Sequence, residues 1–241
     1  DWKLTSTLDR IITKSKIPST KKMGFANAHL EQFKYATRGR RGENPPIIDA
    51  ENDWWALGQH HGLATPLLDW TTSPFVAAYF AFINVGDRQT KHRAIYALHK
   101  PTIEATAKLK KLEKEKENKK ELEEYAKGTK RIVNVLRLES LKQPVKREVE
   151  FIRPMSNENQ RLVNQGGLFT RSPIGKDIES WVQENHKGHD GYTLMKILIP
   201  DKDREMSLRM LNRMNIHHLT LFPDLFGTSK YCNTFAEIDK Y

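Results

Sequence analysis

The stretch Trp54–Phe82 constrains the fold most strongly, because it holds a cluster of polar residues between two apolar segments. Pro66–Trp70 is a short apolar run typical of a buried strand, and the turn Thr71–Ser73 follows it with three hydroxyls. The last of these hydroxyls is well placed as a helix N-cap, and Pro74 suits the first helical position. Phe75–Ile83 is apolar almost all round, which predicts a helix packed on several sides.

The three hydroxyls should therefore lie where a buried strand meets a helix N-terminus. Unpaired N–H groups and the helix dipole favour phosphate and other anions at such a position. Thr71, Thr72 and Ser73 are thus candidates for holding a nucleotide. The alternative interpretation is that Thr71 and Ser73 only cap the helix.

The block QHHGLATPLLDWTTSPFVAAYFA within this stretch resembles the signature of the FRG domain family, which is named for a Phe-Arg-Gly motif. Further blocks in the family order are WKLTSTLDR at the start, NQGGLFTRSP at Asn164–Pro173 and LTLFPDLFGTSKY near the C-terminus. Three departures stand out: Gly62–Pro66 lacks the usual arginine, Phe226 replaces a common acidic residue, and the Phe-Arg-Gly itself is absent. We expect that segment to precede Asp1.

A fainter resemblance links the same turn to ADP-ribosyltransferases, whose NAD site combines an arginine, a Ser-Thr-Ser strand and a Glu-x-Glu strand. By this resemblance Thr71 orients a catalytic glutamate, Thr72 and Ser73 contact NAD, and Tyr79 or a nearby aromatic stacks on nicotinamide. Gln165, beside the Gly166-Gly167 pair, is assigned to the same ligand.

The third element of that site is predicted in the segment Arg147–Pro154, where alternation indicates a half-buried strand with Glu148 and Glu150 on one face. A carboxylate can stabilise the positive charge that develops as the nicotinamide bond breaks, and it can deprotonate the attacking group. Glu150 is the predicted catalytic carboxylate. The alternative is that both glutamates face solvent on an ordinary strand.

Histidines are the remaining candidates for ligand contact. A neutral imidazole at His61, next to Gly62, could hydrogen-bond a ribose or an amide, although a structural role is an equal alternative. His60 and His61 are adjacent and would point about 100° apart in a helix, so they cannot readily share a metal ion. We therefore expect no metal site.

Positive charge is concentrated at the N-terminus. The chain has 40 Lys and Arg against 30 Asp and Glu, and residues 1–43 hold ten of the basic residues and four of the acidic ones, or +6. Arg38, Arg40 and Arg41 form a cluster suited to a phosphate backbone, which predicts binding to nucleic acid, RNA above all. An acidic protein partner and a merely solvated basic face are the alternatives.

Residues 103–129 are predicted to form a protruding charged helical insertion. Eight Lys and six Glu between Lys108 and Lys127 nearly cancel, and their spacing favours a helix. Leu109 and Leu112 are expected to anchor one end. The helix could be a handle for an antitoxin or inhibitor protein, or simply a solvated helix.

The rest of the chain alternates irregularly between predicted strands and helices, which favours an α+β fold of ADP-ribosyltransferase type in one domain, residues 1–241. The single cysteine, Cys232, fits a reducing compartment. Phe75–Ile83 is far shorter than the roughly 20 residues needed to cross a bilayer. We therefore expect a soluble, cytoplasmic protein with no membrane partner.

These observations favour an NAD-dependent ADP-ribosyltransferase that modifies a cytoplasmic macromolecule. The FRG resemblance implies a toxin restrained by an antitoxin in anti-phage defence. The first alternative is a binding module for nucleic acid or protein, in which the hydroxyl turn holds a phosphate without reaction. The second is a nuclease, for which the sequence offers neither a cluster of metal-binding carboxylates nor a catalytic histidine pair.

Overall fold

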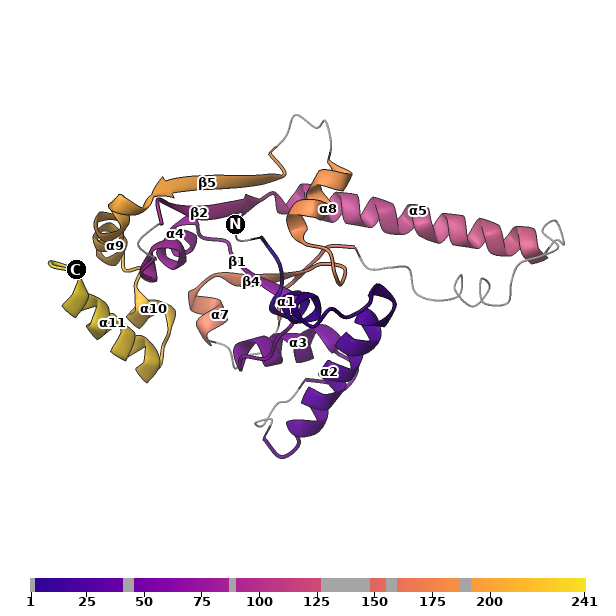
Figure 1. Cartoon of the computed structure of the whole chain (residues 1–241), viewed down its shortest axis with the longest axis horizontal. Helices are drawn as coiled ribbons and strands as arrows, with labels where there is room; N and C mark the ends of the chain where they lie inside the picture. Colours follow the sequence, from indigo (N-terminus) through magenta and orange to yellow (C-terminus); the bar gives the residue numbers. More distant parts are fainter. Residues whose placement is uncertain (1–2, 41–45, 87–89, 127–147, 155–159, 187–191) are drawn as a thin grey trace.

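The computed structural model describes residues 3–40, 46–86, 90–126, 148–154, 160–186 and 192–241 (Figure 1). The described helices are α1 (Thr7–Lys14), α2 (Lys22–Ala36), α3 (Glu51–His60), α4 (Pro74–Ile83), α5 (Lys100–Ala126), α7 (Gln160–Asn164), α8 (Ile178–Asn185), α9 (Arg204–Arg213), α10 (His218–Leu221) and α11 (Leu225–Glu237). The strands are β1 (Leu67–Thr71), β2 (His92–Leu98), β3 (Glu150–Ile152), β4 (Gly167–Arg171) and β5 (Leu194–Pro200). The fold is α+β, as expected.

The described strands form two antiparallel sheets. One has the order β1-β4-β3, and the other pairs β2 with β5. Thr71 lies opposite Gly167 at one end of β4, whereas Glu150 lies opposite Arg171 at the other end. The central strand of the larger sheet thus comes from the second half of the chain, about 100 residues after its neighbour β1.

The segment α3-β1-α4 forms as its sequence predicts. The predicted strand appears as β1, and α4 begins at Pro74 after the N-cap Ser73, whose side chain accepts a hydrogen bond from the Val76 N–H. A proline in the first turn and a hydroxyl cap satisfy the helix end locally, so short-range sequence is sufficient here. Gly62, at φ +83°, lies in the turn between α3 and β1.

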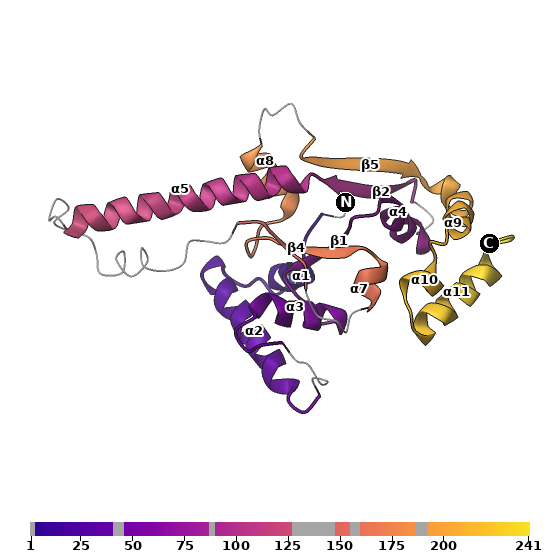
Figure 2. The ribbon, with the colours of Figure 1, turned by 180° about the vertical axis from the view of Figure 1, so that it is seen from behind.

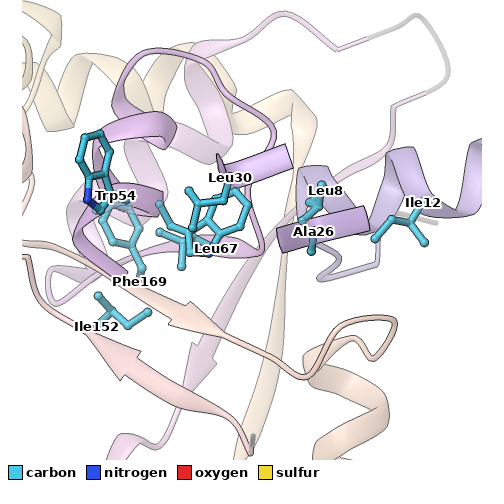
Figure 3. Close-up of a cluster of buried hydrophobic side chains, with 10 residues drawn as sticks. Leu8, Ile12, Ala26, Leu30, Trp54, Leu67, Ile152 and Phe169 are labelled. Atoms are coloured by element: carbon cyan, nitrogen blue, oxygen red, sulfur yellow. The ribbon is translucent and has the colours of Figure 1, made fainter. Parts of the chain in front are cut away.

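The main core packs α1, α2 and α3 against one face of the larger sheet (Figure 3). Trp54 and Trp55 of α3 are each 1% exposed, and they meet Leu67 of β1 and Phe169 of β4. Truncating a buried tryptophan to alanine typically costs about 3–5 kcal/mol. Because this core holds α3 and β1 rigidly together, the polar residues between them are fixed in position.

A second core joins α4 to the C-terminal helices. Tyr79 and Phe82 of α4 are 0% and 1% exposed, and they pack against Leu208 and Leu211 of α9 and Ile238 after α11. Leu208 and Leu211 lie three residues apart and therefore share one face of α9. One side of α4 is therefore committed to the core.

Helix α5 projects from the end of β2, away from α9 and α11 (Figures 1 and 2). Its predicted helical character is confirmed, but its anchor differs from the expectation. Leu109 and Leu112 are 60% and 42% exposed, whereas Ile103 is fully buried and packs with the α8 residues of a third core. The end of the predicted insertion, residues 127–129, lies outside the described residues, and the insertion as a separate unit stays a prediction.

Candidate functional site

A cavity of about 620 Å³ opens where β1 passes into α4. Its walls are largely aromatic and aliphatic, and the aromatic side chains are Trp70, Tyr96, Phe80, Phe169 and Phe222. Its polar groups come from both halves of the chain and are Gln59, His60, Asp69, Thr71, Arg161 and Gln165. A largely apolar cavity of this size with a few convergent polar groups is typical of a small-molecule site.

Asp69 is held in the cavity by a chain of hydrogen bonds. The Gln59 Nε2 donates to Asp69 Oδ2 at 2.9 Å. The Thr65 hydroxyl donates to the Gln59 amide oxygen, and it accepts a hydrogen bond of 3.2 Å from the Leu67 N–H. Thr65 is fully buried. The polar positions of the block before β1 therefore serve to orient one carboxylate.

The protein surroundings of Asp69 change its acidity. Its side chain is accessible from the open cavity, yet protein atoms surround it on the other sides. This burial raises the pKa of the Asp69 carboxyl above its ordinary value of 3.8, and the hydrogen bond from Gln59 opposes the rise. A carboxyl group with a raised pKa in a cavity is a candidate acid or base, because its pKa lies closer to neutral pH.

His60 and Arg161 bring nitrogen donors to the same cavity. Burial, and then the nearby charges of His61 and Arg161, lower the pKa of His60, so its imidazole is neutral at pH 7. Arg161 Nε donates to Asp224 Oδ2 at 3.0 Å, and its guanidinium lies 5.3 Å from the centre of the Phe222 ring. The arginine is thus positioned at the cavity wall by an ion pair and an aromatic face.

The three hydroxyls of the predicted anion site are used within the protein. Thr71 Oγ1 donates to the Gln165 carbonyl at 2.6 Å and accepts from the Ser73 N–H at 3.0 Å. Thr72 Oγ1 donates to the Gly166 carbonyl at 3.3 Å, and Ser73 caps α4. Only Thr71 lines the cavity. The Thr72 hydroxyl joins the end of β1 to the segment before β4, and the Ser73 hydroxyl serves the start of α4, while the assignment of both residues to NAD stays a prediction.

Tyr79 and His61, two further predicted ligand contacts, do not line the cavity, whereas the residue next to each of them does. Tyr79 is 0% exposed, and its hydroxyl lies 2.6 Å from His218 Nδ1 in the second core, so it has no surface for a nicotinamide ring. Phe80, the next residue, lines the cavity in its place. Similarly, His60 and the C-cap His61 of α3 are both exposed, and His60 is the one that lines the cavity.

The predicted pair of glutamates is not assembled with Thr71. Glu150 and Thr71 lie at opposite ends of the sheet with β4 between their strands, an offset of about 14 Å along the strands and about 10 Å across them. The Glu150 carboxylate accepts a hydrogen bond of 3.3 Å from Asn52 of α3.

Glu148 lies before β3 and accepts a hydrogen bond of 2.7 Å from the Trp181 indole N–H of α8. The two glutamates therefore contact different helices rather than one shared site. Arg171, opposite Glu150, forms an ion pair of 2.5 Å with Glu51, so this end of the sheet is a buried polar cluster that links α3 to β4.

Comparison with known proteins relates the first part of the chain to a family. The model of the FRG domain matches residues 1–91, so this part of the chain is similar to the FRG domain family. A search of the curated proteins and a search of the solved structures each gave no match. The two blocks beyond residue 91 that resemble the same family lie outside the match, so their resemblance stays a prediction.

The FRG domain match contains the part of the cavity that carries the carboxylate. Gln59, His60 and Asp69 all lie within it, whereas Arg161 and Phe222 come from the remainder of the chain. Sequence reasoning missed all five residues. The glutamine, the histidine and the aspartate fall within the block that led to the FRG resemblance, and the signal overlooked was the spacing of polar residues within it. Phe222 falls within the block LTLFPDLFGTSKY, which the sequence also singles out, whereas no sequence signal identifies Arg161.

The predicted nucleic-acid contacts lie at the C-terminal end of α2. Arg38 and Arg40 are exposed, and the Arg38 guanidinium lies 3.7 Å from the centre of the Tyr35 ring. Arg41 lies outside the described residues. In Figure 1 this end of α2 points away from α4 and β2, so these arginines do not reach the cavity.

Metal and membrane features can be assessed over the described part of the chain. No group of three or more His, Cys, Asp or Glu side chains there could hold a metal ion. No described helix is both long enough and apolar enough to cross a bilayer.

Proposed function

We propose that the cavity at the end of β1 binds NAD and that the protein is an ADP-ribosyltransferase of a defence system. The single observation that carries this proposal is Asp69, a carboxylate with a raised pKa, held by Gln59 within an aromatic-walled cavity of about 620 Å³. Within this proposal Asp69 takes the role that the sequence assigned to Glu150.

The cavity has the chemical groups that such a dinucleotide needs. Phe80 and Trp70 offer flat faces for the nicotinamide or adenine ring, and Arg161 offers positive charge for the pyrophosphate. Neutral His60 can hydrogen-bond a ribose hydroxyl. The volume falls within the range of about 300–1,000 Å³ found for small-molecule sites.

Asp69 supports the chemistry in two ways. As the bond between ribose and nicotinamide breaks, its electron pair stays with the nicotinamide nitrogen, and the ionised carboxylate stabilises the positive charge that develops on the ribose. As the acceptor attacks that ribose carbon, Asp69 takes the proton that the acceptor loses. A raised pKa makes the carboxylate a stronger base in the second role.

The test is incubation of the protein with NAD labelled on the adenine ring and with total RNA, DNA and protein, followed by separation of the three pools. We expect label in one pool, RNA above all, and a loss of about 10²–10⁴-fold in the Asp69→Asn variant. Glu150→Gln is the matched control, because it also neutralises one carboxylate of the larger sheet, and it should retain most activity.

Two results would contradict the proposal. Equal activity of Asp69→Asn and the unchanged protein would remove Asp69 from the mechanism, and loss of activity only in Glu150→Gln would restore the glutamate assignment. Untouched NAD with retained RNA binding would favour a binding module. Shortened RNA in the absence of NAD would favour a nuclease.

A further inference from the structure

A second cavity of about 670 Å³ lies on the other side of the N-terminal segment and differs from the first in every lining residue. Each residue that lines it is polar, charged or glycine, and the cationic ones are Lys3, Arg10, Lys14, Lys22 and Lys176. We call this cavity the basic recess. We propose that the basic recess binds the phosphate groups of a single-stranded RNA backbone.

The basic recess is assembled from distant parts of the chain. Arg10, Thr13 and Lys14 share one face of α1, because residues three and four apart are neighbours on a helix. The loop after β4 is attached to this helix by the Gly175 N–H, which donates to Asp9 Oδ1 at 2.8 Å. This hydrogen bond joins positions 166 residues apart and places Lys176 beside α1.

Gly175 lets a lysine approach the loop closely. Its φ is +81°, and a Cβ there would lie 2.7 Å from the Nζ of Lys22. The ammonium group of Lys22 therefore rests directly over the loop that closes the recess. A side chain at position 175 would displace it.

The recess keeps an excess of positive charge, because five cationic residues face two carboxylates, a net charge of +3. Asp9 accepts hydrogen bonds from Gly175 N–H and from the Ser6 hydroxyl, the latter at 2.8 Å. Asp177 caps α8 by accepting from the Ser180 N–H at 2.7 Å. Both carboxylates are thus engaged within the protein, and among the cations Lys176 forms an ion pair with Glu184.

The lining favours backbone phosphates over a free nucleotide. The recess has no aromatic or aliphatic side chain on which a base could stack, whereas phosphate recognition needs only positive charge and N–H or O–H donors. Sequence-independent binding of this kind to a single strand depends on phosphate neutralisation and falls with salt.

The basic recess and the aromatic cavity share one short segment of the chain as a wall. Lys3 and Thr5 line the recess, and Leu4 between them lines the aromatic cavity. The same short segment is thus a wall of both. If the proposed transferase function holds, an RNA strand bound in the recess is the acceptor, and this part of the inference rests on that function.

The test measures binding of a fluorescein-labelled 12-nucleotide uridine RNA at several salt concentrations without NAD. A triple variant with Lys3→Gln, Lys14→Gln and Lys22→Gln removes three cations of the recess. The matched control carries Lys116→Gln, Lys119→Gln and Lys120→Gln on exposed α5, which changes the net charge equally.

We expect the recess variant to bind about tenfold more weakly at 0.1 M salt, and the slope of log affinity against log salt to fall by about 2, because each phosphate contact on a single strand contributes about 0.7. The control should stay within twofold. Inorganic pyrophosphate should compete with the RNA for the unchanged protein.

Equal loss in both triple variants would overturn the proposal, because general charge would then explain the binding. Loss of binding to phosphatidylserine vesicles alone, with RNA binding intact, would assign the recess to a membrane surface instead. The recess variant should still bind NAD, because none of its three changed residues lines the aromatic cavity, but it should transfer less ADP-ribose to RNA. If Asp69→Asn consumes NAD normally while the recess variant loses RNA, the proposed function fails and the basic recess stands.

Discussion

The two cavities are nearly equal in volume, about 620 and 670 Å³, but opposite in chemistry. The first has aromatic walls around one carboxyl group of raised pKa, Asp69, and the second is lined by cationic and other polar residues with no aromatic or aliphatic residue among them. The segment Lys3–Thr5 separates them. The difference teaches that one chain can build two cavities of similar size whose lining residues suit different ligands, one with aromatic faces and a carboxyl group and the other with cations.

Among the variants that test the difference between the two cavities, Thr65→Val should have the largest effect on the protein. It breaks the chain of hydrogen bonds that holds Asp69. The variant leaves the Leu67 N–H and the Gln59 amide oxygen without their present partner. Each unsatisfied buried group costs about 1–3 kcal/mol. Chemical unfolding should show a loss of about 2–4 kcal/mol of free energy of unfolding.

The same variant should lower NAD consumption beyond what its stability loss explains, and the matched control is Thr5→Val, which removes a hydroxyl from the wall of the basic recess. We expect the control to leave NAD consumption intact. Full activity in folded Thr65→Val would contradict a positioning role for Thr65.

The next prediction distinguishes the roles of two neighbouring aromatic residues of α4, Tyr79 in stability and Phe80 in ligand binding. Tyr79→Phe removes the hydroxyl that pairs with buried His218, and it should cost about 1–3 kcal/mol of stability without changing the KM for NAD. Phe80→Leu should raise the KM with little loss of stability, because Phe80 lines the cavity and is 39% exposed. Thermal melts measure the stability loss, and steady-state kinetics measure the KM. A raised KM in Tyr79→Phe with an unchanged KM in Phe80→Leu would place the ligand on the other side of α4.

The pH dependence should follow the raised pKa of Asp69. The mechanism needs the ionised carboxylate, so NAD consumption should rise with pH and have its acidic midpoint above 3.8. Gln59→Leu removes the hydrogen bond that lowers this pKa, so the midpoint should move to still higher pH. A rate profile over about pH 3–9 measures both, and a midpoint at or below 3.8 would contradict the assignment.

The contribution of Asp69 to the free energy of unfolding should fall as pH rises, whereas the rate of NAD consumption should rise. Because the folded protein binds the Asp69 proton more tightly than the unfolded chain, the contribution of this group to stability is greatest at low pH and falls as pH rises from 3.8 through the raised pKa. Asp69→Asn should remove that decline.

The smallest effect is expected from Arg38→Gln with Arg40→Gln at the end of α2. These arginines are exposed and lie away from both cavities, so RNA affinity should fall only about twofold through general charge. A loss as large as that of the recess variant would restore the sequence-based assignment of this cluster as the main RNA contact.

Local features of the fold could be predicted from sequence, and pairings between distant segments could not. The turn into α4 was predictable because Ser73 and Pro74 satisfy the helix end by themselves. The place of Glu150 was not, because it depends on β4 inserting between β1 and β3.

The two cavities could not be predicted from sequence for the same reason, because each is assembled from segments that lie far apart in the chain. Asp69 lies in a block that sequence identifies as FRG-like, yet the cavity that it lines is completed by Arg161, Phe222 and other residues from later segments. The basic recess depends on the hydrogen bond from Gly175 to Asp9, which no pattern in either segment indicates.

The most direct test of the account is a titration of NAD followed by the indole N–H signals of the tryptophans in NMR spectra. Trp70 lines the aromatic cavity, and its Nε1 donates to Thr170 at 2.8 Å, whereas Trp54, Trp55 and Trp181 are each 1% exposed in the cores. We predict a saturable shift of the Trp70 signal with NAD, a weaker response of the three core signals, and no Trp70 shift with the uridine RNA. An unchanged Trp70 signal at saturating NAD, or a Trp70 shift with RNA alone, would contradict the division of roles between the two cavities.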